Sequence, residues 1–421
     1  MTFEDLRKDI ILKDGIYYFD FTASGLACKS VEEQISSILL TYANTHSECS
    51  SCARTTTQYY EKARREIKKL LELNDEFYLM PCGYGSSAAM KKFQELLGIY
   101  IPPMLRNRLN IKNSDIKNIP LFIIGPYEHH SNEVSARLAL CECVRIKFDN
   151  NKNVDMNMLE DVLKKNQNRE IIASFNVASN VTGIFSNYKE IYKLIKKYNG
   201  ILALDSSTYS PYGNLDCNFY DAMFLSPHKL IGGIGSSGLL IIKKELCKSN
   251  LPTFAGGGTV SYVSRISQSF THDKEQLEQG GTPGIIQLIR AHLAYKIRNQ
   301  LGFENIKNKE LELKSYFESK FENIKNIITY YPKNQSRLPI YSFNFKDKSP
   351  YDITEILSNK FGIQARAGCA CAGPYGHDLL NLQDDGYFKE RPGFVRIGLH
   401  YTHNKDDIDY LLGALNNISN Y

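Results

Sequence analysis

Short apolar runs alternate with longer amphipathic stretches between residues 77 and 245. The short runs have the length and composition of buried strands, and the longer stretches repeat their apolar residues with a helical period. Strands are predicted at Phe77–Met80, Leu121–Ile124, Ile171–Phe175, Ile201–Leu204, Ala222–Leu225 and Gly238–Ile242, and helices at Met90–Leu97, Met158–Lys165 and Tyr188–Tyr198. This alternation predicts an α/β fold on a mostly parallel sheet, in which ligands bind beyond the carboxyl ends of the strands.

A second series of elements follows toward the C-terminus. It is predicted to contain helices at Gly284–Gln300, Asn305–Asn323 and Asp352–Phe361, strands at Ile327–Tyr331, Tyr341–Phe345, Ile363–Arg366 and Phe394–His400, and a last helix capped by Asn404. We expect a large domain over residues 21–287 and a smaller domain formed by residues 1–20 and 288–421. Residues 102–119 are rich in Asn, Lys and Pro and are predicted to form a surface loop.

Composition and charge narrow the class of protein. The 421 residues are 43% hydrophobic and 11% aromatic, as in a folded globular protein. Lys and Arg exceed Asp and Glu by 51 − 46 = 5 and form no basic stripe, so no nucleic-acid partner is expected. The N-terminus carries acids where a targeting peptide would not, and no apolar run approaches the roughly 18 residues of a membrane span, which predicts a cytoplasmic protein without membrane contact.

The ten cysteines are expected to be thiols, because no secretory signal precedes them. Cys49 and Cys52 form a CxxC pair, but no second pair at zinc-ligand spacing follows it closely. No metal site is therefore predicted. The sequence leaves open whether Cys49 and Cys52 approach a functional site.

Two polar residues at strand ends point to a cofactor. Lys229 comes shortly after the strand Ala222–Leu225, and buried lysines lose a proton readily and form Schiff bases. Asp205 ends the strand Ile201–Leu204. Either residue alone could be structural, Lys229 as a strand-end charge and Asp205 as a helix cap. Together they suggest pyridoxal 5′-phosphate, which needs an amine for its aldehyde and an acid beside its ring nitrogen.

The segment from Gly83 to Met90 follows a predicted strand and opens a predicted helix. Its glycines, serines and free backbone amides suit a phosphate group at a helix start. Gly83, Gly85 and Ala88 also fit a dinucleotide-binding fingerprint. That alternative needs an acid about twenty residues further on to bind ribose, and the stretch Ile101–Lys112 contains none.

Taken in order from Tyr18–Ser24 to the last helix, these segments resemble the class V pyridoxal-phosphate enzymes of fold type I. Within that class the chain is most similar to group II cysteine desulfurases and selenocysteine lyases. The resemblance implies a large domain with a mostly parallel, seven-stranded sheet and a smaller C-terminal α/β domain. It also implies that Lys229 holds the cofactor, that Asp205 pairs with the pyridine nitrogen, and that the phosphate is bound by Ser86, Ser87, Ser226 and His228.

Three further segments carry the same resemblance. Glu128-His129-His130-Ser-Asn132 is similar to a family motif whose first histidine, here His129, stacks on the cofactor ring, although a histidine pair can also be a solvated loop. Asn180 is expected near the ring hydroxyl, and Thr282 is expected to reach the phosphate of the other subunit in a homodimer. The chain departs from the family at Asp205-Ser-Ser-Thr208, because Thr208 stands where the family usually has Gln.

The segment Gln364–Pro374 resembles the family loop Arg-x-Gly-x-x-Cys. Its arginine is Arg366, and five residues on, at 366 + 5 = 371, Cys371 takes the position of the nucleophile. Cys369 occupies a position where relatives often carry His. Arg366 and Arg396 are expected to bind the substrate carboxylate, although either could form an ordinary surface salt bridge. The Gly/Pro-rich loop is expected to be mobile.

The resemblance implies that L-cysteine is converted to L-alanine, with a persulfide on Cys371 that passes to a sulfur-acceptor protein, as in iron–sulfur cluster assembly. Selenocysteine stays open as a substrate. Three alternatives also remain: a class V aminotransferase, epimerase or lyase that uses no cysteine, a molybdenum-cofactor sulfurase-like protein, and a cofactor-free binding protein on the same scaffold.

Overall fold

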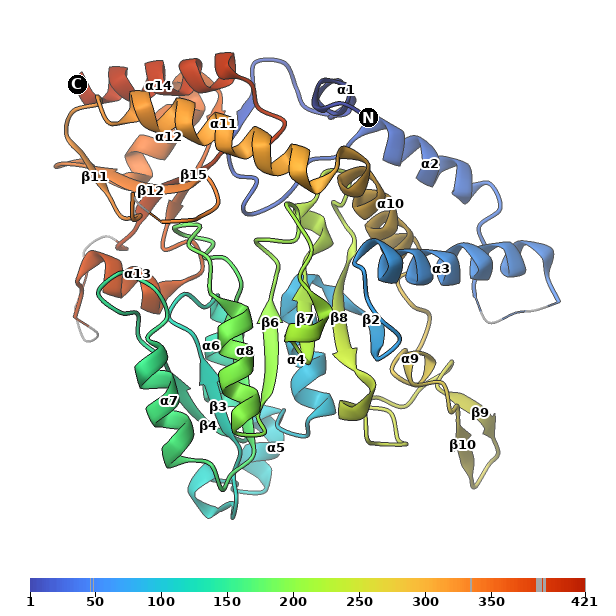
Figure 1. Ribbon diagram of the computed structural model, residues 1–421. Coiled ribbons are helices and arrows are strands. Elements are labelled where there is room, and N and C mark those ends of the chain that lie inside the picture. The colour runs from blue at the N-terminus through green and yellow to red at the C-terminus, as the bar shows by residue number, and fades with distance from the viewer. Residues whose placement is uncertain (46, 48, 334, 384–387, 389–390, 421) are drawn as a thin grey trace.

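The chain is built around one large central sheet, shown in the computed structural model of Figure 1, which describes residues 1–45, 47, 49–333, 335–383, 388 and 391–420. Seven strands lie in the order β2-β8-β7-β6-β5-β3-β4. They are β2 (Phe77–Tyr84), β3 (Leu121–Ile124), β4 (Glu142–Arg145), β5 (Ile171–Asn176), β6 (Ile201–Asp205), β7 (Ala222–Leu225) and β8 (Ser237–Lys243). β8 is antiparallel to β2 and β7, and the other neighbouring pairs are parallel, so the sheet is mostly parallel as predicted.

Helices cover both faces of this sheet, which explains why its central strands are continuous apolar runs. Successive residues of a strand point to opposite faces. In β3, Ile123 packs in the core on one face, and Phe122 and Ile124 pack in the core on the other. The helices α7 (Met156–Lys165) and α8 (Tyr188–Lys197) cover the first face, and α4 (Gly85–Leu96) and α6 (His130–Leu138) cover the second (Figure 1).

A second, four-stranded sheet has the order β11-β12-β15-β14. Its strands are β11 (Ile327–Thr329), β12 (Ile340–Phe345), β14 (Arg366–Gly368) and β15 (Phe394–Gly398), and the helices α11 (Phe303–Phe321), α12 (Pro350–Phe361) and α14 (Lys405–Asn420) pack around it. As predicted, Asn404 caps the last helix, because its Oδ1 accepts a hydrogen bond of 2.9 Å from the Asp407 amide. The core of this sheet also contains Phe19 from the N-terminal segment.

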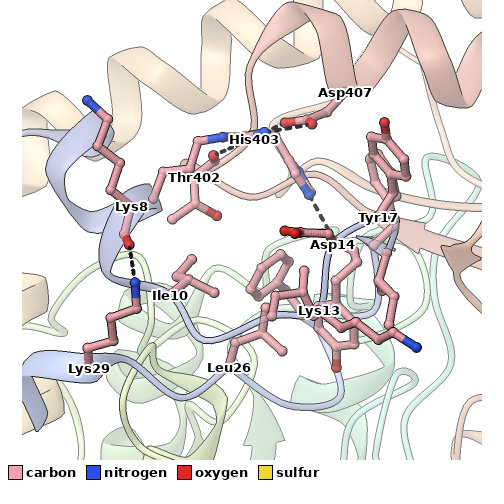
Figure 2. Close-up of a pocket in the computed structure, with 17 residues that line it drawn as sticks. Lys8, Ile10, Lys13, Asp14, Tyr17, Leu26, Lys29, Thr402, His403 and Asp407 are labelled. Carbon is pink, nitrogen blue, oxygen red and sulfur yellow. Dashed lines mark hydrogen bonds and ion pairs between the residues drawn. The ribbon is translucent and has the colours of Figure 1, made fainter.

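The N-terminal segment joins the two parts of the molecule. It contains α1 (Phe3–Asp9) and β1 (Tyr17–Tyr18), which pairs in parallel with β13 (Ile363–Gln364). Figure 2 shows the segment beside Thr402, His403 and Asp407, around a cavity of about 470 Å³. The helix α10 (Ile285–Leu301) packs on α3 (Ser51–Leu70) and contributes to the larger core. The predicted domain division after residue 287 stays a prediction.

The predicted loop at residues 102–119 is wrong in part, because it contains the helix α5 (Pro103–Arg108) and the short 3₁₀ helix η1 (Asn113–Asp115). Pro103 at the start favours the helix, and both pieces are tied to the end of α6. Arg106 donates to the carbonyls of Leu138 and Ala139, and Asn113 donates to the carbonyls of Ala139 and Cys141. Side-chain hydrogen bonds to a distant carbonyl leave no periodic signal in the sequence.

Several elements were not indicated by the apolar pattern. They are α1, β1, α2 (Lys29–Leu39), α3, α6, β4, β9 (Val260–Val263), β10 (Gln268–Phe270), α9 (Lys274–Leu277), α13 (Gly373–Leu380), and the 3₁₀ helices η2 (Cys217–Phe219), η3 (Pro227–Lys229) and η4 (Lys244–Leu246). Among the described helices, none combines the length and the apolar character needed to cross a bilayer. All ten cysteines are free thiols.

Candidate active site

Twelve of the thirteen predicted site residues line one cavity of about 240 Å³. The cavity lies where β6 and β7 end and where the second sheet meets the first. Its predicted lining residues are Ser86, Ser87, His129, Asn180, Asp205, Thr208, Ser226, His228, Lys229, Arg366, Cys371 and Arg396. Parallel strands bring residues that are far apart in the sequence to a common edge, which is why these side chains meet.

Lys229 and Asp205 carry the charges at the end of the sheet. Asp205 is the last residue of β6, it is buried, and its Oδ1 accepts a hydrogen bond of 3.0 Å from the Ser207 amide. Lys229 follows β7 within η3. Burial lowers the pKa of Lys229 to about 8, although the nearby carboxylate of Asp205 opposes this shift. An amine with such a pKa is partly neutral near neutral pH and can act as a nucleophile or a base.

The start of α4 forms a cradle of backbone amides and hydroxyls. The Ser86 amide donates to Ser226 Oγ at 2.9 Å, and Ser226 Oγ in turn donates to Ser207 Oγ at 3.2 Å. Gly85 has a φ of 52°, which favours glycine, and a Cβ there would lie 2.8 Å from His228 Cε1, so any other residue would have to displace the His228 ring. Burial lowers the pKa of His228 to about 4, which keeps this imidazole neutral. A helix start with such donors favours an anion.

His129 enters the cavity from the N-terminus of α6, where it is the capping residue. Its Nδ1 accepts a hydrogen bond of 3.1 Å from the Ser131 amide, so the ring proton lies on Nε2. Burial, followed by the charge of Lys229, lowers the pKa of His129 to about 4. The preceding residue, Glu128, is buried and accepts hydrogen bonds from Asn132 Nδ2 at 2.7 Å and the Asn176 amide at 2.8 Å. These bonds fix the backbone from which His129 projects.

The two arginines lie on the side of the cavity opposite the large sheet, and both donate hydrogen bonds to one carboxylate, that of Asp20. This role of Asp20 was not predicted from the sequence. Arg366 and Arg396 face each other across the antiparallel pair β14 and β15. Asp20 accepts from Arg366 Nε at 3.0 Å and from Arg396 Nη2 at 2.6 Å. The Arg396 side chain is 3% exposed and that of Arg366 is 40% exposed. The only sequence signal for Asp20 was an acid directly after the aromatic run Tyr17–Phe19.

The cysteine segment is a hydrogen-bonded turn, and the mobility expected for this loop stays a prediction. Cys371 is exposed and lines the cavity, and Cys369 is partly buried. Asn180 Nδ2 donates to the Ala370 carbonyl at 2.6 Å, and the Ala372 backbone amide donates to the Cys369 carbonyl at 3.0 Å. Glycine and proline here start the helix α13 rather than prolong a loop.

Thr282 is the predicted site residue that does not line the cavity. It is exposed, and its Oγ1 accepts a hydrogen bond of 3.2 Å from Asn44 Nδ2. A role toward a second subunit therefore stays a prediction. Cys49 and Cys52, near the start of α3, are exposed and do not line this cavity either.

A sheet with a lysine and a carboxylate at its strand ends, beside an anion cradle, defines a pyridoxal-phosphate protein of fold type I. A sequence profile of the family Aminotransferase class-V matches residues 108–411 of the chain. The protein belongs to this family, and its cofactor is pyridoxal 5′-phosphate.

The chain is similar over nearly its whole length to proteins named cysteine desulfurase. It is 28% identical to a probable cysteine desulfurase of Pyrococcus abyssi, over 98% of this chain and 96% of that protein. It is 25% identical to a probable cysteine desulfurase of Staphylococcus aureus, over 94% and 91%. The fold matches the apo structure of a cysteine desulfurase from Thermococcus onnurineus NA1 with a TM-score of 0.82 at 24% identity, covering 99% of this chain and 98% of that chain.

The residues of the cavity fit this cofactor. The cavity offers one amine, one buried carboxylate and an amide cradle, which match the aldehyde, ring nitrogen and phosphate of the cofactor. Two buried polar atoms at the cavity, Asn180 Oδ1 and Arg396 Nε, have no hydrogen-bond partner within the described part of the chain. Buried polar atoms normally find a partner, so these two are available to a bound molecule.

Proposed function

We propose that the protein is a pyridoxal-phosphate-dependent cysteine desulfurase, which converts L-cysteine to L-alanine and keeps the sulfur as a persulfide on Cys371. The observation that carries the proposal is the position of the Cys371 thiol, which lines the same cavity as Lys229, Asp205 and two arginines. The relatives named as probable cysteine desulfurases cover nearly the whole chain and support the same activity.

The cofactor would be held by the residues that line the sheet side of the cavity. Lys229 would carry it through the amine, and Asp205 would keep its ring nitrogen protonated. When bound, the cofactor withdraws electrons from the Cα of an amino acid. The other proposed contacts are phosphate binding by Ser86, Ser87, Ser226 and His228, ring stacking by His129, and proximity of Asn180 and Thr208 to the ring hydroxyl.

The substrate carboxylate would bind the two arginines. Arg366 and Arg396 carry two positive charges, and Asp20 already balances one of them. One net positive charge is left for one carboxylate, and the planar guanidinium groups can bind it with paired hydrogen bonds. This arrangement favours an α-amino acid and orients its side chain relative to Cys371.

Proton and sulfur transfer would then use Lys229 and Cys371. Once the substrate amine has replaced it, the neutral amine of Lys229 removes the Cα proton. The Cys371 thiolate attacks the substrate sulfur, so that an S–S bond forms while the Cβ–S bond breaks. The electron pair of the broken bond goes to Cβ, which takes a proton and becomes a methyl group, and the protonated amine of Lys229 returns a proton to Cα to give alanine. The sulfur stays on Cys371 as a persulfide, and no outside oxidant is needed.

The active form is proposed to be a homodimer in the cytoplasm, in which Thr282 completes the phosphate site of the other subunit. Thr282 is exposed in the single chain, which leaves it available for such a contact. The exposure of Cys371 would let a sulfur-acceptor protein reach the persulfide, and iron–sulfur cluster assembly is one destination for that sulfur.

The test is release of alanine and sulfide from L-cysteine, measured with and without a thiol reductant. Cys371→Ser should lower alanine release at least about a hundredfold, because a hydroxyl is a far poorer nucleophile toward sulfur. It should keep the visible absorbance of the bound cofactor. Cys369→Ser, the matched control two residues away, should retain most of the alanine release. Normal turnover by Cys371→Ser would instead support a class V enzyme that uses no cysteine.

A further inference from the structure

The backbone around the Cys371 thiol adopts a conformation that needs outside support. Ala370 has a φ of 50° and Cys371 a φ of 59°, so two successive residues other than glycine lie in the left-handed region. This region is unfavourable for residues with a Cβ, and such backbone persists only where the surroundings hold it. The contacts that hold this turn therefore decide where the thiol points.

Two of those contacts come from a single residue, His130 at the start of α6. Its backbone amide donates to the Cys371 carbonyl at 2.8 Å. Its ring Nε2 accepts from the Gly373 amide at 2.6 Å. One bond is therefore made to the carbonyl of Cys371 itself, and the other to the backbone amide two residues further on. His130 and Gly373 are 243 positions apart in the sequence.

The surroundings suit this bond in two ways. An acceptor Nε2 requires a neutral ring with its proton on Nδ1. Burial lowers the pKa of His130, with Glu133 opposing and Arg137 adding to the shift, so the neutral form is favoured. A Cβ at Gly373 would lie 2.8 Å from His130 Nε2, so only glycine lets its amide approach the ring.

We propose that His130 is a positioning residue that holds the Cys371 turn against the cavity through its ring Nε2 and its backbone amide. The adjacent histidines then have separate tasks, since the ring of His129 lines the cavity and the ring of His130 contacts the cysteine segment. The effect on catalysis rests on the proposed function. The tether itself can be measured without turnover.

The test compares His130→Leu, which removes the acceptor but keeps bulk, with His130→Gln, whose side-chain oxygen can still accept from Gly373. In His130→Leu, deuterium exchange of the Gly373 amide should rise about tenfold or more, because the amide loses its acceptor. The kcat for alanine release should fall about tenfold or more, because the thiol loses its fixed position. KM for L-cysteine should stay within about twofold, since Arg366 and Arg396 are unchanged.

His130→Gln should restore both the exchange protection and most of the kcat, and the exposed His272→Leu serves as the control for a histidine outside the site. The cofactor absorbance of every variant should match the wild type. Unchanged Gly373 exchange in His130→Leu, or a glutamine variant no better than the leucine variant, would overturn the tether. The two proposals can also fail separately. If Gly373 exchange is faster in His130→Leu and restored in His130→Gln, but the wild-type protein releases no alanine from L-cysteine, the tether stands and the proposed desulfurase activity is rejected.

Discussion

The two sides of the active-site cavity are built differently. On the sheet side, Asp205, Ser226 and Lys229 lie at or just after the ends of β6 and β7, so the adjoining strand places each of them. On the opposite side, Arg366 and Arg396 are fixed by Asp20, which is 346 and 376 positions away. The first side is specified by local sequence, whereas the second depends on contacts between distant segments.

This difference predicts that a substitution on the sheet side has the largest effect on activity, because it removes a reacting group altogether. Lys229→Ala should lower alanine release by roughly a thousandfold or more, because the variant loses both the amine that holds the cofactor and the base for the Cα proton. The measurement is alanine release under saturating cofactor. Lys244→Ala, at a lysine in η4 outside the cavity, is the matched control and should retain full activity. A loss of less than tenfold in Lys229→Ala would contradict the assignment.

The same difference explains what the sequence could and could not predict. The strands of the large sheet other than β4 were predicted, because buried strands are continuous apolar runs bounded by polar residues, although β2 extends to Tyr84 beyond its predicted end at Met80. Lys229 and Asp205 were found because a charge directly after such a run is unusual. The contacts of Asp20 with Arg396 and of His130 with Gly373 could not be predicted, because the partners are hundreds of positions apart and such contacts leave no periodic pattern in the sequence.

Missed elements have a similar cause. The β9–β10 hairpin carries exposed apolar side chains such as Tyr262 and Val263, so its sequence does not alternate as a half-buried pair would. The cysteine segment is rich in glycine, and two of its glycines have structural reasons: a Cβ at Gly373 would lie 2.8 Å from His130 Nε2, and Gly368 takes a φ of 106°. Glycine composition alone does not distinguish a mobile loop from a tightly held turn.

A second prediction tests the side of the cavity formed by Arg366 and Arg396. Here the planar shape of the guanidinium group, and not its charge alone, should determine substrate binding. Arg396→Lys keeps the positive charge but loses the fork that bonds Asp20 at 2.6 Å and the Asn180 carbonyl at 3.0 Å. KM for L-cysteine should rise roughly tenfold to thirtyfold, while kcat falls less, because paired hydrogen bonds to the carboxylate are lost. Steady-state alanine release gives both constants. An unchanged KM would remove Arg396 from the substrate site.

A third prediction uses the pKa of Lys229 before cofactor is bound. Below about pH 8 its amine is protonated and cannot attack an aldehyde, whereas above that pH it is neutral. The rate at which apoprotein captures the cofactor should therefore rise about tenfold per pH unit below 8 and level off above it. Stopped-flow absorbance measures this profile. Asp205→Asn removes a charge that raises the pKa of Lys229, so the midpoint should move to lower pH, and a midpoint near 10 in either protein would contradict the buried amine.

The smallest expected effect comes from the contact that anchors the N-terminal segment, and it tests whether the arginine side depends on distant support. Arg7 Nη2 donates to Asp407 Oδ1 at 2.9 Å and Arg7 Nη1 donates to the Thr402 carbonyl at 3.0 Å, beside the cavity of Figure 2. His403 adds a bond of 2.9 Å from its Nε2 to the Tyr18 carbonyl, two residues before Asp20.

Arg7→Met should therefore weaken the attachment of the N-terminal segment that positions Asp20. The effect should be small, because the His403 hydrogen bond to Tyr18 and the β1–β13 pairing remain. Asp407 also accepts a hydrogen bond of 2.9 Å from the Asn404 amide, so it keeps a donor in Arg7→Met, and KM for L-cysteine should rise no more than about threefold. Lys8→Met is the matched control, because Lys8 is exposed and its salt bridge to Glu4 stays within α1, and its KM should equal that of the wild type. A rise of KM in Arg7→Met without any change in cofactor absorbance would mean that the arginine side is held from a distance. Equal KM values in the two variants would show that β1 and His403 alone are enough to place Asp20.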